Sequence, residues 1–223
     1  MALDVFVTGT DTGVGKTLIA CALLHRLRAR GLRALGMKPV AAGVEPTPEG
    51  PANPDVVALR RASSWAAPLN QVNPYCFEAP VAPHLAAQEA GVRIEIAPIR
   101  KAFDALRASA DAIVVEGVGG FLVPLNDGED AADLAVALAL PVVLVVGMRL
   151  GCLNHALLTQ QAVVARSLRL CGWIANSIDP HMARFEENVQ ALRERLAAPL
   201  LGVVPHRCAP DPASFELRLP SDF

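Results

Sequence analysis

Residues 3–18 read Leu-Asp-Val-Phe-Val-Thr-Gly-Thr-Asp-Thr-Gly-Val-Gly-Lys-Thr-Leu, and this stretch decides the fold of the chain. It opens with an apolar run at residues 5–7 whose side chains favour a β-strand. It closes on Gly15-Lys16-Thr17 and continues directly into an apolar run at residues 18–20 that favours a helix. A strand, a glycine-containing loop and a helix in this order form the structural context that a P-loop requires.

Each part of this loop has a role in binding phosphate. Glycines at positions 9, 13 and 15 allow sharp turns that bring backbone N–H groups close to an anion. The Lys16 ammonium at the helix start reaches the β- and γ-phosphates, and the Thr17 hydroxyl is a ligand for Mg²⁺. The spacing is one residue longer than the standard pattern, because Thr10 stands where that pattern has glycine. The alternative interpretation is a glycine turn that binds nothing.

The composition indicates one α/β domain over residues 1–223. The chain is 52% apolar but only 4% aromatic, so its core has to be built from Ala, Val, Leu and Ile, as in buried parallel strands. A formal charge of −2 provides no basic surface for nucleic acid or for an anionic membrane. We therefore expect small-molecule ligands rather than nucleic acid or membrane partners.

The sequence also predicts a cytoplasmic location. Its five cysteines form no Cys-x-x-Cys pair, which indicates reduced thiols, and no basic or cleavable leader precedes the first strand. The longest apolar stretch, residues 134–148, is too short to span a bilayer and contains Pro141. We interpret this stretch as the end of a helix followed by a buried strand.

Strand-like and helical patterns alternate along the chain. Apolar residues at helical spacing predict helices over residues 17–30 and 182–197, and a further helix that Pro98 opens. The Pro-rich segment at residues 72–84 is predicted to be an irregular loop. Short apolar runs predict strands at residues 33–37, 112–116, 141–147, 170–175 and 200–204. This alternation predicts a doubly wound, mainly parallel sheet of the P-loop NTPase type, in three layers, with ligands at the carboxyl ends of the strands.

Three charged side chains stand where such a ligand is expected. Glu116 ends a predicted strand, at the position where P-loop proteins usually carry an aspartate for Mg²⁺. Lys38 follows another strand, and Asp55 begins a helix that Asn53 caps after a proline-rich loop. Each has a plain alternative, because many strands end in an acid, many lysines are only solvated, and an acid in a first turn complements the helix dipole.

Several motifs distributed along the chain form a recognisable combination. They are Val7-Thr8-Gly9-Thr10-Asp11-Thr12-Gly13-Val14-Gly15-Lys16-Thr17, Met37-Lys38-Pro39-Val40-Ala41, Asn73-Pro74-Tyr75, Val115-Glu116-Gly117-Val118-Gly119-Gly120, Val145-Val146-Gly147-Met148-Arg149-Leu150-Gly151-Cys152-Leu153-Asn154-His155 and Pro199-Leu200-Leu201-Gly202. Together they resemble the dethiobiotin synthetases. The resemblance covers nearly the whole chain, up to about Pro205, and is much more specific than a P-loop alone.

The resemblance implies an ATP-dependent ligase of biotin biosynthesis that converts 7,8-diaminononanoate, CO₂ and ATP to dethiobiotin, ADP and phosphate. One amine takes up CO₂ as a carbamate, and transfer of the γ-phosphate to a carbamate oxygen gives a mixed anhydride. The second amine attacks the carbon, closes the ureido ring and releases phosphate. Because the substrate supplies both nucleophiles, the protein has to supply positioning and positive charge.

By the same resemblance the catalytic residues are Lys38, Lys16 and Thr12. The ligands of Mg²⁺ are Thr17, Asp55 and Glu116, and such oxygen donors suit this hard cation. The residues implied at the nucleotide are Gly13, Val14, Gly15, Lys16, Thr17, Leu18, Asp55, Glu116, Gly117, Gly119, Asn176, Ser177, Pro205, His206 and Arg207. Those implied at the substrate are Thr12, Lys38, Ala42, Gly119, Gly151 and Asn154. The family further implies a homodimer whose interface completes the substrate site.

Three positions depart from the family pattern. Gly13 stands where the family often has an acid, and Ala42 stands where it often has a serine that contacts substrate. The missing serine hydroxyl removes a hydrogen bond typically worth about 0.5–1.5 kcal/mol, which weakens binding without stopping the reaction. After Arg207 the chain is Pro-rich, and the late acidic nucleotide contact of the family has no assigned counterpart.

Other P-loop proteins provide the competing interpretations. The synthetase domain of the cobyrinic acid amidases shares the fold, but those enzymes carry a glutaminase domain for which this chain is too short. A nucleotide switch of the partitioning-ATPase type usually has an extra lysine early in the loop, where this chain has Thr10-Asp11-Thr12. A small GTPase needs Asn-Lys-x-Asp, and the stretch Asn176-Ser177-Ile178-Asp179 lacks the lysine. A preference for GTP over ATP would favour the switch.

Overall fold

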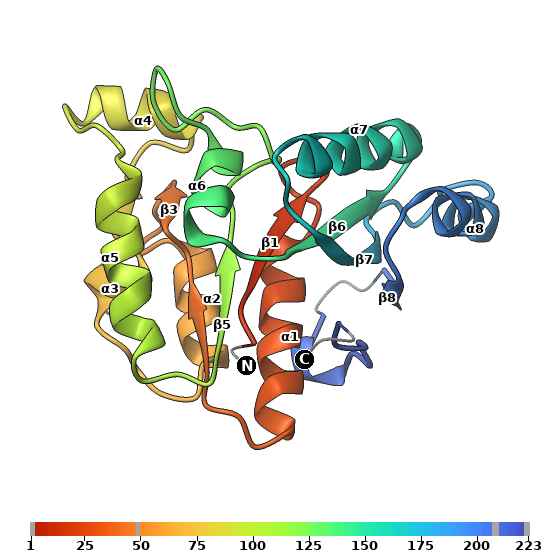
Figure 1. Cartoon of the computed structure of the whole chain (residues 1–223), viewed down its shortest axis with the longest axis horizontal. Helices are drawn as coiled ribbons and strands as arrows, with labels where there is room; N and C mark the ends of the chain where they lie inside the picture. Colours follow the sequence, from red (N-terminus) through yellow and green to blue (C-terminus); the bar gives the residue numbers. More distant parts are fainter. Residues whose placement is uncertain (1–2, 48–49, 207–209, 221–223) are drawn as a thin grey trace.

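The computed structural model describes residues 3–47, 50–206 and 210–220, with a six-stranded sheet at its centre (Figure 1). Neighbouring strands pair in parallel throughout this sheet. The strands lie in the order β2 (Ala34–Met37), β5 (Ala112–Glu116), β1 (Val5–Gly9), β6 (Val142–Met148), β7 (Leu170–Ser177) and β8 (Leu200–Val204). The predicted strands are confirmed, and the continuous apolar run at 141–147 forms a central strand, where both faces are buried.

Helices cover both faces of the sheet and produce the three predicted layers. Side chains alternate along β1, so that Val5 and Val7 pack into one core and Phe6 packs into another. In Figure 1 α2, α3 and α5 lie to the left of β1, and α7 and α8 lie to its right. The helices are α1 (Lys16–Ala29), α2 (Pro54–Ala62), α3 (Leu69–Val72), α4 (Pro83–Glu89), α5 (Ile96–Arg107), α6 (Ala131–Leu138), α7 (Cys152–Ala165) and α8 (Phe185–Arg195). None of the helices in the described ranges combines the length and the hydropathy needed to cross a membrane.

The prediction of an irregular loop at residues 72–84 is wrong. This segment contains the strand β4 (Tyr75–Phe77) and the start of α4. The strand pairs in parallel with β3 (Val40–Ala42), which the sequence analysis did not predict, in a separate two-stranded sheet. Strands of three residues show no readable periodicity, and this pairing depends on contacts between segments far apart in the chain.

Two predicted helix starts also differ from the structure. The helix α5 begins at Ile96 rather than at Pro98, because a proline is tolerated anywhere in the first turn, where the N–H groups have no intrahelical partner. The helix α8 begins at Phe185 rather than at residue 182. The predicted cap of α2 is confirmed, because the Asn53 side chain accepts from the backbone N–H of Asp55 at 3.1 Å.

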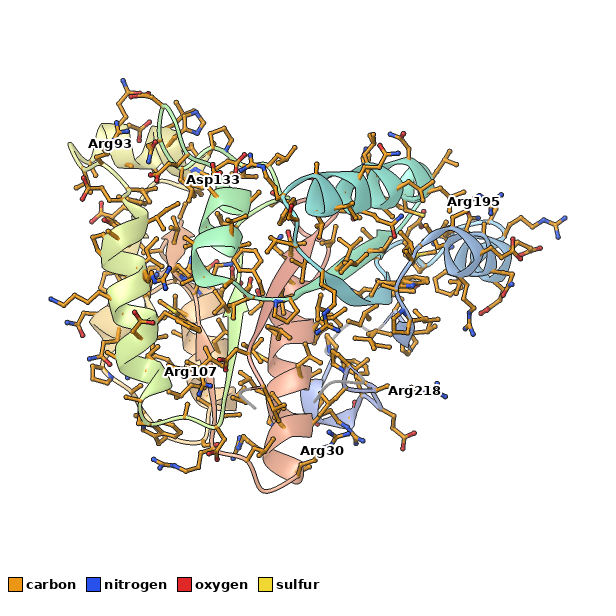
Figure 2. The ribbon with its side chains drawn as sticks, viewed as in Figure 1. Arg30, Arg93, Arg107, Asp133, Arg195 and Arg218 are labelled. Carbon is orange, nitrogen blue, oxygen red and sulfur yellow. The ribbon has the colours of Figure 1, made fainter. Side chains whose placement is uncertain are left out.

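A partly buried ion pair joins α5 to the amino ends of β1 and β5. Arg107 lies at the end of α5 (Figure 2), and its Nε is 2.5 Å from Oδ2 of Asp4. The other carboxylate oxygen of Asp4 accepts from the backbone N–H of Ile113 in β5 at 2.8 Å. Burial raises the pKa of Asp4, and the Ile113 amide and the Arg107 guanidinium act in the opposite direction. These contacts lie at the amino ends of β1 and β5, away from the edge where ligands bind.

The segment after β8 returns to cover α1. It forms a 3₁₀ turn at Pro212–Ser214 that contacts α1, and Phe215 and Leu217 are buried in the same core as the α1 side chains. The backbone N–H of Arg218 donates to the Leu201 carbonyl at 2.8 Å. A Cβ at Gly202 would lie 2.6 Å from Leu217, so glycine is needed for this close approach. In the described part of the tail, Phe215 and Leu217 are therefore part of the core.

We expect Phe215→Ala to destabilise the fold by about 3–5 kcal/mol, because it leaves a cavity beside α1. The measurement is the free energy of unfolding from chemical denaturation. Leu69→Ala is the control, since Leu69 is 53% exposed and its loss should change the free energy by less than about 0.5 kcal/mol. Equal stability of the two variants would mean that the tail does not contribute to the core in solution.

Candidate active site

A cavity of about 740 Å³ opens at the carboxyl ends of β1, β2 and β5. This is the edge at which open parallel sheets bind ligands. The cavity unites residues from the P-loop, the end of β2, the start of α2 and the end of β5. The sequence-predicted residues that line it are Thr12, Gly13, Gly15, Lys16, Thr17, Lys38, Ala42, Asp55, Glu116 and Gly119.

The P-loop has the backbone conformation that phosphate binding needs. Gly13 and Gly15 have positive φ values of 73° and 91°, which glycine adopts without strain, and α1 begins immediately afterwards at Lys16. The Lys16 ammonium donates to the Asp11 carbonyl at 3.0 Å. Burial, followed by repulsion from the Lys38 ammonium, lowers the pKa of Lys16 to about 8. The loop thus presents a positive group and a helix N-terminus to the cavity.

Lys38 is held by three oxygen atoms. Its Nζ lies 2.6 Å from Oε1 of Glu116, 3.0 Å from Oδ2 of Asp55 and 3.0 Å from the Gly117 carbonyl. The side chain is only 3% exposed. Burial lowers the pKa of Lys38, but Glu116 and Asp55 more than offset this effect and raise it above the usual value. The solvated-lysine alternative is therefore wrong, and Lys38 is a buried ammonium that stays charged.

Three oxygen-bearing side chains meet beside this ammonium. The Thr17 hydroxyl lies 2.7 Å from Oδ1 of Asp55 and 2.9 Å from Oε1 of Glu116. The Lys38 ammonium lowers the pKa of Asp55 against the effect of burial. The second carboxylate oxygen of Glu116 is buried without a hydrogen-bond partner in the described chain. Hard oxygen donors with one such unpartnered oxygen fit Mg²⁺, which keeps its remaining positions for water and phosphate.

A second group of predicted residues lies behind the P-loop. Asn176, at the end of β7, is 5% exposed and its Nδ2 donates to the Val14 carbonyl at 2.8 Å. A Cβ at Gly15 would lie 2.2 Å from that Nδ2, so the two residues are in direct contact. The ring Nδ1 of His206 lies 3.3 Å from the Ser177 carbonyl. Pro205 is exposed beside His206, and Arg207 lies outside the described residues.

Gly151 and Asn154 are separate from this cavity. Both are exposed at the start of α7, and neither is among the described residues that line the cavity. Arg149, two residues before Gly151, pairs with the P-loop, and its Nη2 lies 2.5 Å from Oδ2 of Asp11. Leu18, in the first turn of α1, is partly buried against the core and is not among the described residues that line the cavity.

Known proteins resemble this chain over nearly its whole length. A family model described as an AAA domain matches residues 4–213. The ATP-dependent dethiobiotin synthetase BioD of Aromatoleum aromaticum is 60% identical over 217 residues, which cover 96% of each chain. The protein of the same name from Xylella fastidiosa is 56% identical over 207 residues, which cover 92% of each chain. This chain belongs to the dethiobiotin synthetase family.

Solved structures confirm the fold of this member of the dethiobiotin synthetase family. The MinD protein of Pyrococcus horikoshii with Mg-ADP has a TM-score of 0.58 and 16% identity, and the match covers 93% of this chain and 82% of that one. MinD of Aquifex aeolicus has a TM-score of 0.57 and 20% identity, with 93% and 84% covered. At these identities the likeness shows a P-loop NTPase fold alone.

The sequence analysis missed one wall of the cavity in this member of the dethiobiotin synthetase family. That wall consists of Pro80, Val81, Ala82, Pro83, Val118 and Val123. Residues 80–82 lie in the connection between β4 and α4, which begins at Pro83, and the Pro-rich composition of this segment indicated a structured loop but not a site. A Cβ at Gly119, whose φ is 59°, would lie 2.8 Å from Cγ2 of Val123 and 3.5 Å from the Thr12 hydroxyl, so glycine allows both side chains to lie close to the backbone here. The apolar wall depends on where β4 and α4 pack, which no local pattern reveals.

The position of the P-loop on the sheet depends on Gly147 in β6. A Cβ at this residue would lie 2.6 Å from Cγ1 of Val14 and 2.9 Å from its Cβ. The backbone N–H of Gly147 also donates to the Thr10 hydroxyl at 3.3 Å. Glycine therefore allows the loop to lie directly on the end of the strand.

We expect Gly147→Ala to weaken ADP binding by about tenfold or more, since overpacking of about 1–3 kcal/mol would displace Val14. Calorimetric titration with ADP measures this change, and circular dichroism confirms folding. Gly128→Ala is the matched control, because the nearest heavy atom to an added Cβ is 3.9 Å away. Unchanged ADP affinity in a folded Gly147→Ala protein would contradict this account.

Proposed function

We propose that this chain forms the ureido ring of dethiobiotin from 7,8-diaminononanoate, CO₂ and ATP, and releases ADP and phosphate. The observation that carries the proposal is the meeting of Lys16 and Lys38 with Asp55 and Glu116 in one cavity. Two ammonium groups beside a phosphate-binding loop suit a reaction that joins two anions, a carbamate and a triphosphate. The function named for relatives at 55–60% identity supports the same reaction.

The chemistry needs no covalent group of the protein. A carbamate oxygen attacks the γ-phosphorus, and the bond from phosphorus to the bridging oxygen breaks as ADP leaves. The free amine then attacks the carbamoyl carbon, phosphate leaves with the bonding electrons, and the amine nitrogen loses a proton. Lys16 binds the phosphate oxygens, while Lys38, which is paired with Glu116, stabilises the carbamate and the transferring phosphoryl group.

The metal ligands of this proposal are Thr17, Asp55 and Glu116. When bound there, Mg²⁺ would neutralise phosphate oxygens. The nucleotide base would lie near Asn176 and Ser177, with Pro205 and His206 beside it, while Arg207, which the resemblance also implies there, lies outside the described residues. Within the described structure the Asn176 amide donates one hydrogen to the Val14 carbonyl, so its second hydrogen and its carbonyl oxygen could bind adenine. The backbone of residues 13–18 and of Gly117 and Gly119 completes this nucleotide site.

The diamine would extend from Lys38 along the part of the cavity that Thr12, Gly119 and Ala42 line. Thr12 and Gly119 face each other there, and the Ala42 side chain and residues 80–83 provide an apolar wall for the alkyl chain. Because Gly151 and Asn154 lie outside the cavity of a single chain, we propose that a homodimer brings them to the carboxylate end of the substrate. Cytoplasmic location stays a prediction of the sequence.

The test is ADP release with Mg²⁺ and bicarbonate, with and without 7,8-diaminononanoate. We expect release that depends on the diamine and a product of the mass of dethiobiotin. Lys38→Ala should abolish this turnover and leave ATP affinity within about twofold, because Lys38 acts on the carbamate side. Lys101→Ala, on the exposed face of α5, is the control and should keep full turnover. Nucleotide binding without diamine dependence would instead favour a nucleotide switch.

Ala42 allows a prediction about substrate affinity. Ala42→Ser restores the hydroxyl that the family often has at this cavity wall. We expect the KM for the diamine to fall by about two- to tenfold, the equivalent of one hydrogen bond, while kcat and the KM for ATP stay nearly constant. Initial rates at varied diamine concentration measure it. An increased KM would mean that the residue 42 side chain does not face the substrate.

A further inference from the structure

The motif Asn73-Pro74-Tyr75 has no role in the site described above, although it belongs to the pattern shared with the family. None of its three residues lines the cavity in the described structure. Asn73 is nevertheless only 7% exposed, and it caps the end of α3, with Pro74 between it and β4. A buried amide side chain has to satisfy its hydrogen-bonding groups, so its partners indicate why it is there.

The partners of the Asn73 side chain are two backbone carbonyls, one at Lys38 and one in its own segment at Tyr75. Its Nδ2 donates to the Lys38 carbonyl at 2.7 Å and to the Tyr75 carbonyl at 2.9 Å. Both hydrogens of the amide nitrogen are therefore used. One side chain thus joins the end of β2 to the start of β4, across 35 residues of sequence.

Backbone contacts from the same segment hold the rest of this junction. The Lys38 N–H donates to the Val72 carbonyl at 2.9 Å, and the Tyr75 N–H donates to the Pro39 carbonyl at 3.1 Å. Lys38 and Pro39 connect β2 of the large sheet to β3 of the small one, so neither residue belongs to a strand. Pro39 has no N–H to donate. The backbone position of Lys38 is consequently set by residues 72–75 rather than by a sheet ladder.

We propose that Asn73 is a positioning residue for the Lys38 ammonium, an inference that rests on the proposed role of Lys38 in the reaction. The ammonium has to meet three oxygens within 2.6–3.0 Å, and its side chain starts from a backbone that Asn73 holds. Loss of the two amide donors lets the Lys38 carbonyl turn away and the side chain move with it. A displacement of this kind lowers the rate far more than it lowers binding, because alignment is lost while the P-loop stays intact.

The test compares Asn73→Ala with Asn126→Ala. Asn126 is a matched control because its Nδ2 also joins two segments, donating to the Ile94 carbonyl at 2.8 Å and to Oε2 of Glu129 at 2.7 Å. It lies beside Arg93, which is labelled in Figure 2 near α4, and outside the cavity. We expect Asn73→Ala to lower kcat by about ten- to hundredfold. For Asn73→Ala, the KM values for ATP and the diamine and the Kd for ADP should stay within about twofold of the wild-type values. For Asn126→Ala, kcat and all of these constants should stay within the same range.

A second readout does not depend on turnover. The chain has three lysines, Lys16, Lys38 and Lys101, and an amine-acetylating reagent followed by peptide mass spectrometry measures the rate at each. The exposed Lys101 is the internal reference. We expect the ratio of the acetylation rate of Lys38 to that of Lys101 to rise about fivefold or more in Asn73→Ala. The loss of one to two hydrogen bonds that hold the Lys38 backbone would expose the ammonium by about this factor. The ratio should stay unchanged in Asn126→Ala.

The outcomes separate this proposal from the proposed function. If the wild-type protein shows no diamine-dependent turnover, the reaction is wrong, and the acetylation ratio still tests whether Asn73 holds Lys38. An unchanged ratio in Asn73→Ala would overturn the positioning role. So would an equal loss of kcat and ADP affinity, since that indicates damage to the whole site. If Asn73→Ala does not fold, Asn73→Leu keeps the volume, lacks the donors and carries the same test.

Discussion

The burial of the Lys38 ammonium is the constraint on which the rest of the site depends. A charged group that is 3% exposed is costly unless ionised partners and hydrogen bonds surround it. Glu116 and Asp55 are those partners, and the Gly117 carbonyl satisfies the remaining donor. Such an arrangement adds little to stability, because desolvation consumes much of the attraction. Its value is that a positive charge stands at a fixed position in the wall of the cavity.

The parallel sheet makes this convergence possible. Since β5 lies between β1 and β2, the end of β5 at Glu116 is adjacent both to the P-loop and to the segment that carries Lys38. The first turn of α2 adds Asp55 from the side, and the Asn53 cap fixes where that turn begins. Residues 17, 38, 55 and 116 are far apart in sequence, and the parallel register of neighbouring strands brings them within hydrogen-bond distance.

The lengthened P-loop also has a physical explanation. Thr10, which stands in place of the usual glycine, is attached to β6 twice: its N–H donates to the Val145 carbonyl at 3.0 Å and its hydroxyl accepts from Gly147 at 3.3 Å. Asp11 then pairs with Arg149, just beyond the end of the same strand. The extra residue thus connects the nucleotide loop to the strand that leads into α7. The departure from the standard spacing extends the loop without disturbing the phosphate-binding conformation at Gly13 and Gly15.

The sequence by itself determined the elements and the chemistry of the nucleotide half. The run from Val5 to Thr17 carries its own conformation, because glycine positions, strand propensity and a helix start are local properties. Glu116 and the Asn53 cap were likewise readable from their places in local patterns. Only the tertiary structure decided the small sheet of β3 and β4, the apolar cavity wall, the burial of Phe215 and the contact of Asn73 with Lys38. Those features depend on pairing and packing between distant segments, and single side chains or three-residue strands leave no periodic signal for such contacts.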